Sequence, residues 1–543
     1  MSVLAIDAGT TGVTALIVAD DGTVAGRGYQ EFRQYFPQPG WVEHLPEGIW
    51  QATLAACTQA IRAAGSPALA CVGITNQRET AVLWDRTTLA APHRAIVWQD
   101  RRTAQICAAL RAAGHEPRVA ELTGLRIDPY FTATKLTWLA ESEPAVWAGV
   151  LDGSVAVGTV DSYLIARLTG GRRQVCDASN ASRTLLFDIS LGQWSAELCE
   201  LFRVPPHALP EVVPSTGVVG HTDPDVFLGL SLPVAGIAGD QQAALFGQAC
   251  FDVGAAKCTY GTGSFVLANT GASIVRSEAG LLSTVAWLEP SGQLTYALEG
   301  SVFVTGAAIQ WLRDGLGLLD NAGQSEGLAR SVPDAGGVVF VPALTGLGAP
   351  DWDPAARGAI FGLTRGTTRA HLIRAALEAI TFEVRDVVDV MTAEAAARTQ
   401  SVGRAGAPGV APQASTAGAP GVALRASTAG APGVAPRAST AGAPGVAPRA
   451  STAPLRVDGG ASANDLLLQL QADQLQRSVE RPVIAETTAL GAAFLAGLGT
   501  GVWSSRAELA ATWQLDRRFD PGTRDDAAHV RWRSAVERTK GWA

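Results

Sequence analysis

Residues 2–31, SVLAIDAGTTGVTALIVADDGTVAGRGYQE, decide the fold because they hold three strands in immediate succession. Apolar runs over residues 2–8 and 13–19 are joined by the tight sequence GTTG, and a third run follows over residues 23–31. Short apolar runs separated by glycine-containing turns predict an antiparallel meander. The meander places the carboxyl group of Asp7 at the end of the first strand, beside the GTTG turn.

The same strand pattern returns in the second half of the chain. A helix predicted from about residue 46 and a buried strand over residues 70–75 follow the meander. Two strands over residues 256–260 and 265–269 are again joined by a turn, GTG, and a later strand is expected over residues 338–342. We therefore expect an α/β protein with two related halves and a cleft between them.

Length, composition and charge limit the function classes. With 543 residues the chain is too long for one ordinary core, and 47% apolar with 17% charged residues is typical of a globular protein. The net charge of −8 disfavours nucleic acid and anionic membranes as partners, because both need clustered positive charge. Chemistry on a small molecule is the better expectation.

The cysteines and the amino terminus indicate the cytoplasm. The seven cysteines are odd in number and contain no CxxC pair, which is typical of reduced thiols. The first residues lack the basic segment of a signal peptide, and the longest apolar stretch, around residues 489–499, is too short to cross a bilayer. A cytoplasmic protein without a membrane span is expected.

A repetitive segment interrupts the second half. The sequence GAPGVA begins at residues 406, 418, 430 and 442 within a stretch of Ala, Pro, Gly, Ser and Thr, which cannot form a packed core. This disordered insert is locally basic, and both a solvated loop and a docking arm for an acidic partner stay open. The expected domains are an amino-terminal domain (1–249), a carboxy-terminal domain (250–400 and 454–520), the disordered insert (401–453) and a tail or helix (521–543).

Two turns between strands have the composition of phosphate-binding loops. Asp7 precedes the GTTG turn, whose amides and hydroxyls can surround an anion, and residues 261–263 form a corresponding turn in the second half. Asp240 ends a further apolar strand, and the glycines of residues 458–462 let a nucleotide lie against backbone. The chain has no Walker A lysine motif. The pattern favours an actin-like nucleotide cleft.

Ten longer stretches carry a resemblance to known proteins. They are PGWVEH (39–44), GITNQRET (73–80), AIVWQDRRTA (95–104), IDPYFTATK (127–135), GIAGDQQAALFGQ (236–248), TYGTG (259–263), YALEGSVF (296–303), GLGAPDWDPAARGAIFGLTRG (346–366), LRVDGGASAN (455–464) and TALGAAFLAGL (488–498). Together they resemble the glycerol kinases of the FGGY carbohydrate-kinase family. The resemblance implies two actin-like, ribonuclease H-like ATPase domains flanking a central cleft, and ATP-dependent phosphorylation of glycerol to sn-glycerol 3-phosphate in glycerol catabolism.

The resemblance also implies a substrate pocket with Asp240 as general base. Asp240 would accept the proton of the attacking hydroxyl, because phosphoryl transfer otherwise needs positioning and charge neutralisation. Arginine donates a planar fork to neighbouring oxygens, glutamate accepts from hydroxyls, and aromatic side chains exclude water. The residues implied to contact glycerol are Arg78, Glu79, Trp98, Tyr130, Asp240, Gln241 and Phe265.

ATP and Mg²⁺ are the implied cofactors. Asp7 and Asp240 would help to place Mg²⁺, and Asp7 would act through water because this ion keeps much of its hydration. Many glycerol kinases have serines and then an arginine in this hairpin, whereas this chain has Gly12 and Thr14. We expect the affinity for the nucleotide to be altered as a result. The residues implied to contact the nucleotide are Thr10, Thr11, Gly12, Thr14, Gly261, Thr262, Gly306, Gln310, Gly460 and Asn464.

Residues 222–231, TDPDVFLGLS, predict that one form of regulation is absent. They replace a glycine-rich basic loop that in some bacterial relatives binds the inhibitor fructose 1,6-bisphosphate. Because this loop carries Asp223 and Asp225 and no cation, millimolar bisphosphate should leave turnover unchanged. A turnover assay with and without the bisphosphate checks the prediction, and clear inhibition would contradict it.

Two alternatives stay open at this point. Another sugar or polyol kinase of the same family would keep Asp7, Asp240 and both hairpins but differ around the substrate. A non-catalytic actin-like module would bind ATP without glycerol-stimulated phosphate transfer. The sequence also leaves open whether the protein assembles as a homodimer or a homotetramer.

Overall fold

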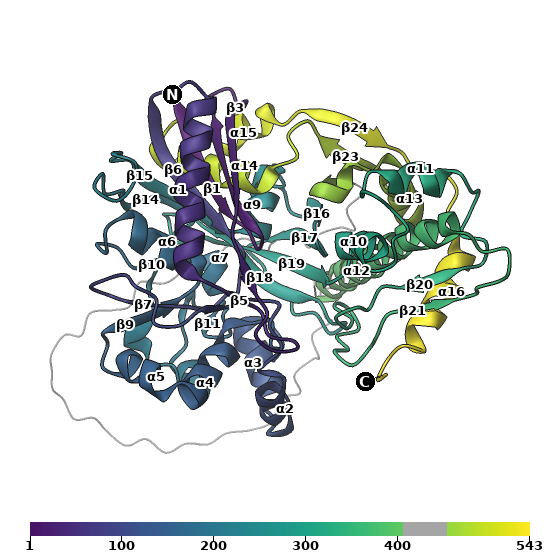
Figure 1. The fold of residues 1–543 in the computed structure, drawn as a ribbon, viewed down its shortest axis with the longest axis horizontal. Helices are drawn as coiled ribbons and strands as arrows, with labels where there is room; N and C mark the ends of the chain where they lie inside the picture. Colours follow the sequence, from purple (N-terminus) through teal and green to yellow (C-terminus); the bar gives the residue numbers. More distant parts are fainter. Residues whose placement is uncertain (406–452, 543) are drawn as a thin grey trace, which may run out of the picture.

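The computed structural model describes residues 1–405 and 453–542. Within them the chain forms a first lobe on a six-stranded sheet and a second lobe on a seven-stranded sheet (Figure 1). The disordered insert predicted over residues 401–453 lies almost wholly outside the described residues, so that prediction stays untested.

The sheet of the first lobe begins with the predicted meander. Its first three strands pair antiparallel in chain order, while the first strand also pairs in parallel with β6, and β6 pairs in parallel with β15. Parallel pairing aligns the carboxyl ends of β1, β6 and β15 at one sheet edge. In spatial order the strands are β14 (Thr216–His221), β15 (Pro233–Gly239), β6 (Leu69–Asn76), β1 (Ser2–Ala8), β2 (Gly12–Val18) and β3 (Val24–Glu31).

The sheet of the second lobe repeats this arrangement. The hairpin of β16 and β17 is antiparallel, and β22 pairs in parallel with β16 as β6 does with β1. In spatial order the strands are β18 (Leu282–Leu288), β19 (Leu294–Val302), β17 (Ser264–Gly271), β16 (Ala256–Tyr260), β22 (Leu455–Asp458), β23 (Val479–Pro482) and β24 (Leu515–Phe519). The expected strand near residues 338–342 exists as β20 (Val339–Val341), but it pairs with β21 (Ala359–Phe361) outside this sheet.

Two helices lie between the sheets, α9 (Asp240–Gly247) and α14 (Thr487–Thr500). Buried side chains of α14 pack with those of both sheets in one apolar cluster, which joins the lobes. The two helices cross at glycines: a Cβ built on Gly491 would lie 1.8 Å from the carbonyl oxygen of Ala243. Only glycine permits this approach, which brings Asp240 at the start of α9 close to the second lobe.

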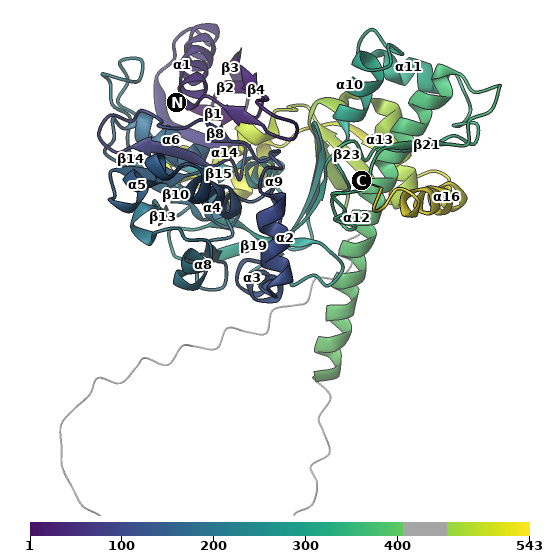
Figure 2. The ribbon, with the colours of Figure 1, turned by 60° about the horizontal axis from the view of Figure 1, so that its bottom comes forward.

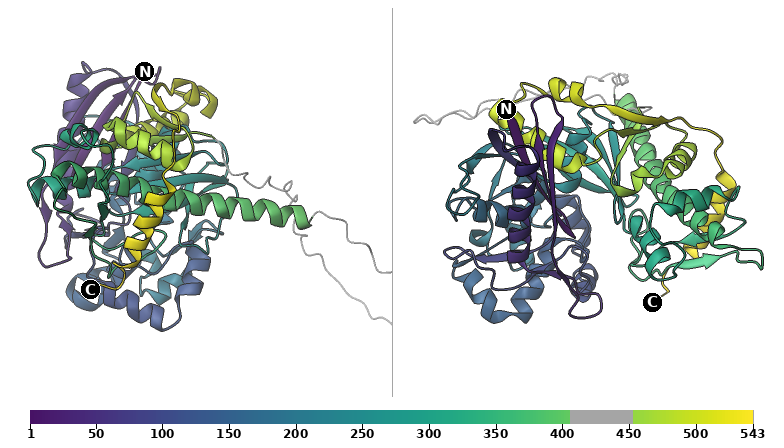
Figure 3. Two further views of the ribbon diagram at one scale, coloured as in Figure 1. Left: turned by 90° about the vertical axis from the view of Figure 1, so that its right-hand side faces the viewer. Right: turned by 45° about the horizontal axis from the view of Figure 1, so that its top comes forward.

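The long helix α12 (Arg369–Ala405) crosses the second lobe and extends away from it (Figures 2 and 3). Apolar residues recur at helical spacing along its first part, and its buried side chains through Met391 belong to the core of the second lobe. The helix continues beyond the amphipathic stretch to Ala405, so residues 401–405, which were assigned to the disordered insert, are helical.

The remaining strands form smaller sheets outside the two main ones. No helix among residues 1–405 and 453–542 is long and apolar enough to cross a membrane, and all seven cysteines are free and buried. The other strands are β4 (Gln34–Tyr35), β5 (Glu43–His44), β7 (Val82–Asp85), β8 (Ala95–Ile96), β9 (Val155–Gly158), β10 (Val175–Asp177), β11 (Phe187–Asp188), β12 (Gln193–Trp194) and β13 (Glu211–Val213). The other α-helices are α1 (Pro46–Ala63), α2 (Ala104–Ala112), α3 (Glu116–Thr123), α4 (Thr132–Ser142), α5 (Pro144–Leu151), α6 (Val160–Leu168), α7 (Ala178–Ala181), α8 (Ala196–Leu201), α10 (Gly306–Asp314), α11 (Gln324–Arg330), α13 (Asp465–Leu475), α15 (Arg506–Thr512) and α16 (Asp526–Glu537).

Candidate active site

Three parallel strands of the first lobe end in polar residues at one sheet edge. Asp7 lies near the end of β1, and β15 runs into Asp240, the first residue of α9. The middle strand, β6, runs into Arg78 and Glu79. Ligands of α/β proteins commonly bind at the carboxyl ends of such strands. The structure therefore gathers four residues that the sequence assigned to the site.

Asp7 and Asp240 influence each other electrostatically. Burial and the neighbouring Asp240 raise the pKa of Asp7 to about 7, so Asp7 is only partly ionised near neutral pH. The Asp240 side chain is 28% exposed, and its Oδ1 lies 3.1 Å from Nε of Arg78. The same oxygen accepts the backbone N–H of Gln241 at 2.7 Å. Asp240 is thus a fixed carboxylate that remains in contact with solvent.

The guanidinium of Arg78 is enclosed by protein acceptors. Its Nη1 and Nη2 donate to the two carboxylate oxygens of Glu299 at 2.6 and 3.1 Å. Nη1 also donates to Gln242 at 3.2 Å, and Nη2 to the hydroxyl of Tyr130 at 3.3 Å. The sequence assigned this fork to glycerol, whereas in the structure the fork binds Glu299, because a buried guanidinium needs a paired carboxylate. The contact of Arg78 with the site is the one from its Nε to the carboxylate of Asp240.

Arg78, Glu79, Arg183 and Glu299 form a buried charge network that joins the lobes. Arg183 donates from Nε to Glu79 at 2.7 Å and from Nη2 to Glu299 at 2.9 Å. Glu299 comes from β19 of the second lobe, and the other three belong to the first lobe. Burial alone would raise the pKa of Glu299, but Arg183 and Arg78 overcome this effect and hold that pKa at about 2. Glu299 therefore stays ionised at neutral pH.

The backbone of Glu79 is held in an unusual conformation. Its φ of 60° is uncommon for a residue with a side chain. Its carbonyl oxygen accepts hydrogen bonds from Nζ of Lys135 at 3.2 Å and from Oγ1 of Thr132 at 3.1 Å. Lys135 also donates to the carbonyl oxygens of Tyr130 at 2.6 Å and Phe131 at 3.2 Å. Burial lowers the pKa of Lys135 to about 7.

Aromatic side chains enclose the space next to these charges. The ring centroid of Trp98 lies 5.7 Å from that of Tyr130 and 6.4 Å from that of Phe265, both edge to face. The guanidinium carbon of Arg78 lies 5.7 Å from the centroid of Phe265. Trp98, Tyr130 and Phe265, which the sequence assigned to one pocket, are thus neighbours, and they come from both lobes.

The second lobe contains a cavity of about 550 Å³ below β16 and α10. All six nucleotide-site residues that the sequence assigned to this half line it, and Ile309, Leu377, Ile380 and Leu467 provide apolar walls. A concave, largely apolar site with a few polar groups suits a nucleoside. The six assigned residues are Gly261, Thr262, Gly306, Gln310, Gly460 and Asn464.

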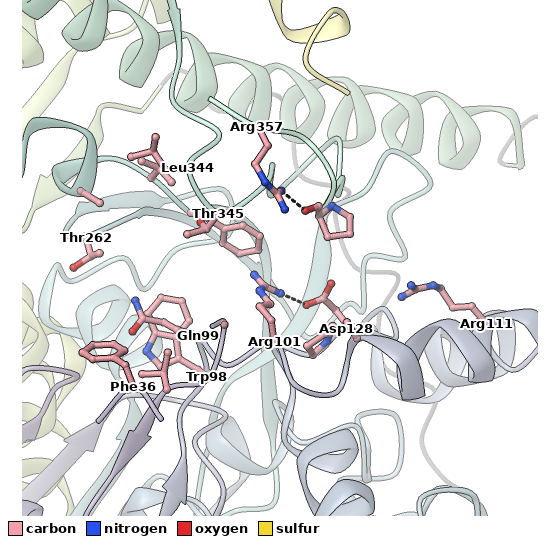
Figure 4. A pocket seen from close by; sticks show the side chains of 18 residues that line it. Phe36, Trp98, Gln99, Arg101, Arg111, Asp128, Thr262, Leu344, Thr345 and Arg357 are labelled. Carbon is pink, nitrogen blue, oxygen red and sulfur yellow. Dashed lines mark hydrogen bonds and ion pairs between the residues drawn. The ribbon is translucent and has the colours of Figure 1, made fainter. Parts of the chain in front are cut away.

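A second cavity of about 660 Å³ opens between the lobes (Figure 4). Trp98, Gln99 and Phe36 line it from the first lobe, and Thr262 and Thr345 from the second. Because Thr262 lines both cavities, they meet at the turn after β16. The two cavities therefore adjoin at Thr262.

The first hairpin touches the substrate pocket through Thr10, whose Oγ1 accepts the indole N–H of Trp98 at 2.9 Å. Thr11 is exposed at the turn, and Thr14 pairs with Asp7 across the β1–β2 ladder. A Cβ built on Gly12 would lie 2.8 Å from both the carbonyl oxygen of Gln30 and the hydroxyl of Tyr29. The packing of this chain therefore favours glycine at residue 12.

Sequence reasoning missed four residues that hold the site together. Glu299 and Arg183 complete the charge network, Lys135 fixes the backbone of Glu79, and the fully buried Lys257 donates to Gln241 and to Thr259. One signal was available: the chain has only three lysines, and two of them, Lys135 and Lys257, are buried. A lysine is rarely fully buried unless its ammonium group is paired. The small number of lysines in the sequence therefore indicated that each has a specific role.

The residues present fit a hydrated Mg²⁺ bridging to a nucleotide. Within residues 1–405 and 453–542, no group of three or more His, Cys, Asp or Glu side chains could form a protein-only metal site. Mg²⁺ commonly needs only one or two carboxylates when phosphates and water supply the other ligands. Asp7 and Asp240 provide that number, and a cation beside Asp7 would offset the burial and the repulsion from Asp240 that together raise its pKa.

Comparisons with known proteins agree over the whole chain. Residues 2–247 match the amino-terminal domain, and residues 256–500 the carboxy-terminal domain, of the FGGY family of carbohydrate kinases. The glycerol kinase of Aromatoleum aromaticum is 50% identical over 544 residues, with 99% of each chain covered. Glycerol kinase 2 of Thermotoga maritima is 46% identical over 545 residues, again with 99% of each chain covered.

A solved structure gives the same result. The crystal structure of Plasmodium falciparum glycerol kinase with ADP matches with a TM-score of 0.80 at 31% sequence identity. The match covers 99% of this chain and 98% of that one. The expected fold, two actin-like lobes flanking a cleft, is therefore confirmed.

Proposed function

The chain belongs to the FGGY family of carbohydrate kinases, and on that premise we propose that it transfers the γ-phosphoryl group of ATP to a terminal hydroxyl of glycerol. The product is sn-glycerol 3-phosphate. One observation carries the proposal: Thr262 lines both the nucleotide cavity and the cavity that contains Trp98. A phosphoryl group held at Thr262 would face the substrate pocket directly.

Asp240 is the proposed general base. Its carboxylate accepts the proton of the glycerol hydroxyl while that oxygen forms a bond to the γ-phosphorus. The bond from phosphorus to the β,γ-bridging oxygen breaks, its electron pair stays on that oxygen, and ADP leaves. Nε of Arg78, 3.1 Å from Oδ1, holds the carboxylate in its orientation.

The substrate pocket combines polar groups for hydroxyls with aromatic walls. Glu79, Tyr130 and Gln241 are proposed to meet the glycerol hydroxyls, and Trp98 and Phe265 to cover its carbon chain. Trp98 contacts Tyr130 and Phe265 edge to face at centroid separations of 5.7 and 6.4 Å, so the three rings form one apolar wall. Excluding water matters because water is the competing nucleophile. A pocket that combines polar groups with apolar walls suits a small polyol.

The two lobes divide the binding of ATP. We assign the nucleoside to the cavity of the second lobe, and the phosphates to Thr10 and Thr11 on one side and Thr262 on the other. Gly12 and Thr14 support the first hairpin. Mg²⁺, placed by Asp7 and Asp240, would neutralise charge on the phosphates when bound. In terms of domains, residues 1–249 carry glycerol and phosphate binding, and residues 250–400 and 454–520 carry nucleotide binding.

The cellular setting follows from the cysteines. Seven buried, unpaired thiols suit a reducing compartment, and a kinase needs the ATP of the cytoplasm, where we place the protein. A homodimer or homotetramer is the expected assembly, and sedimentation would distinguish them.

A coupled assay of ADP release tests the function. With Mg²⁺, ATP and glycerol the purified chain should turn over, while a pentitol and a ketopentose should support rates lower by at least about tenfold. Excess EDTA should abolish the rate, and added Mg²⁺ should restore it. A higher kcat/KM for a five-carbon substrate would replace glycerol with another sugar of the family, and ATP binding without any transfer would favour the non-catalytic module.

A further inference from the structure

Three arginines line the cavity between the lobes, Arg101, Arg111 and Arg357, and we call this group the arginine vestibule. In Figure 4, Arg101 and Arg357 point toward one another from opposite walls, and Arg111 approaches from α2. Arg101 and Arg111 belong to the first lobe, and Arg357 lies between β20 and β21 of the second. None of the three takes part in the proposed phosphoryl transfer.

The hydrogen bonds of these arginines leave donors for a ligand. Arg101 donates from Nη1 to Asp128 at 2.8 Å, and Arg111 from Nη1 to the carbonyl oxygen of Ile127 at 2.5 Å. Arg357 donates from Nη1 to two carbonyl oxygens of its own loop, both at 2.8 Å. Within residues 1–405 and 453–542, Nη2 and Nε of these three arginines donate no hydrogen bond. A guanidinium has five N–H donors, so each retains unused ones.

The charge of the vestibule is positive although the protein is acidic. Asp128 is the one acidic residue among those that line this cavity, against three arginines. The chain as a whole carries a net charge of −8. A cleft lined by one sign of charge concentrates counter-ions, and forked guanidinium groups match the oxygens of a phosphate. The local charge therefore selects an anion.

We propose that the arginine vestibule binds a phosphate monoester dianion, and that its physiological ligand is the product glycerol 3-phosphate on its way out of the cleft. This assignment rests on the proposed function. The same cavity is lined by Thr262 and Trp98, where the new ester would form, and, away from them in Figure 4, by the three arginines. Glycerol enters without charge and does not respond to the vestibule, whereas the departing product is held by it.

The test compares a neutral substrate with an anionic product in the double variant R111Q/R357Q. The inhibition constant for glycerol 3-phosphate should rise about 5- to 10-fold, because two of three cations are removed. The KM for glycerol should change less than about twofold. In the parent protein product inhibition should weaken as salt is raised, and in the double variant this salt dependence should nearly disappear. R111K/R357K should restore the inhibition constant and its salt dependence, since lysine keeps the charge.

Two controls make the outcome decisive. R203Q removes a 69% exposed arginine elsewhere on the first lobe and should leave product inhibition unchanged. Methyl phosphate and inorganic phosphate are tested beside glycerol 3-phosphate: equal sensitivity to R111Q/R357Q identifies a general phosphate site, and sensitivity for glycerol 3-phosphate alone identifies the product. An unchanged inhibition constant in R111Q/R357Q, or a parallel rise in the KM for glycerol, would overturn the proposal.

A binding measurement separates this proposal from the proposed function. Calorimetric titration of glycerol 3-phosphate into the parent protein and into R111Q/R357Q needs no turnover. If the chain fails to phosphorylate glycerol but still loses affinity for the ester in R111Q/R357Q, the vestibule stands and the assigned reaction does not. If turnover is normal and the affinity is equal in both proteins, the proposed role of the vestibule is refuted and the proposed function stands.

A second inference comes independently from Lys135. Its Nζ donates to the carbonyl oxygens of Glu79, Tyr130 and Phe131 from a fully buried position. The chain uses arginine for nearly every basic position and keeps only three lysines, and Arg78 and Arg183 show that it can also bury arginine. A planar guanidinium cannot reproduce a compact ammonium with three converging carbonyls. We infer that Lys135 is a positioning residue for Glu79 and Tyr130.

Variants at residue 135 test this inference. K135M should lower kcat/KM for glycerol by about 10- to 100-fold, because small displacements of substrate-binding groups are costly. The KM for ATP should stay within about twofold, since the nucleotide cavity lies in the second lobe. K135R should not restore glycerol binding, whereas methylammonium should partly rescue K135A. A lower melting temperature with both KM values unchanged, or an equal loss for both substrates, would overturn the inference.

Discussion

D240N should reduce kcat by about 10³-fold while the KM for glycerol changes only a few-fold. Asparagine has nearly the same shape as aspartate, but its amide cannot accept the proton of the attacking hydroxyl. General-base catalysis typically contributes about 10²- to 10⁴-fold, and no second carboxylate takes this place. Asp7 is the nearest candidate, yet burial and Asp240 raise its pKa to about 7, and it comes from β1 beside the phosphate hairpin.

The measurement is steady-state kinetics with saturating ATP and Mg²⁺. D225N supplies a matched control, because Asp225 is an exposed carboxylate on the loop after β14 and should retain full turnover. Retention of more than about a tenth of the parent kcat in D240N would mean that proton transfer does not depend on this carboxylate. The proposed mechanism would then lose its base, although the binding geometry would remain.

E299Q should have the largest effect on stability. Glu299 neutralises both Arg78 and Arg183, and removing one partner of a buried ion pair typically destabilises a protein by about 3–5 kcal/mol. The variant should also lose glycerol binding, because Arg78 then lacks the partner that holds it beside Asp240. The melting temperature and the KM for glycerol should therefore change together.

The pH dependence gives a further check on Glu299. Its pKa in the folded protein, about 2, lies below the ordinary value of 4.5, so its ionised form stabilises the fold above pH 4.5. That contribution is lost as pH falls from about 4.5 to about 2, and E299Q should lack it. E121Q is the control, since Glu121 pairs with Arg118 on the surface at 64% exposure and should cost at most about 1 kcal/mol. Equal melting temperatures for E299Q and E121Q would contradict the assigned role.

Much of the site was predictable because its residues sit in local patterns. The GTTG and GTG turns follow short strands, so the positions of Thr10 and Thr262 at strand ends could be inferred from spacing alone. The six residues of the nucleotide cavity came from the family resemblance, and the structure places all six around one cavity. Local signals of this kind survive in a single sequence because neighbouring residues define them.

Contacts between distant segments could not be predicted. Glu299 meets Arg78 across 221 residues of sequence, and the sequence around each residue does not indicate the other. The fork of Arg78 was assigned to glycerol for this reason, since its carboxylate partner was unknown. The strand β20 was predicted but not its separate sheet, because pairing depends on what packs beside it, here α12 and α16. Residues 406–452 lie outside the described part of the chain.

The scarcity of lysine has a practical consequence. Lys135 and Lys257 are buried, so the amines left for a surface reagent are Lys540, 32% exposed on the carboxy-terminal tail, and the amino terminus of Met1. Neither lies among the residues that line the nucleotide cavity or the cavity between the lobes. A succinimidyl ester or an aldehyde resin would therefore attach this protein at one of two known points. An enzyme electrode prepared in this way would carry molecules in few orientations, with the cleft left free for diffusion of reactants.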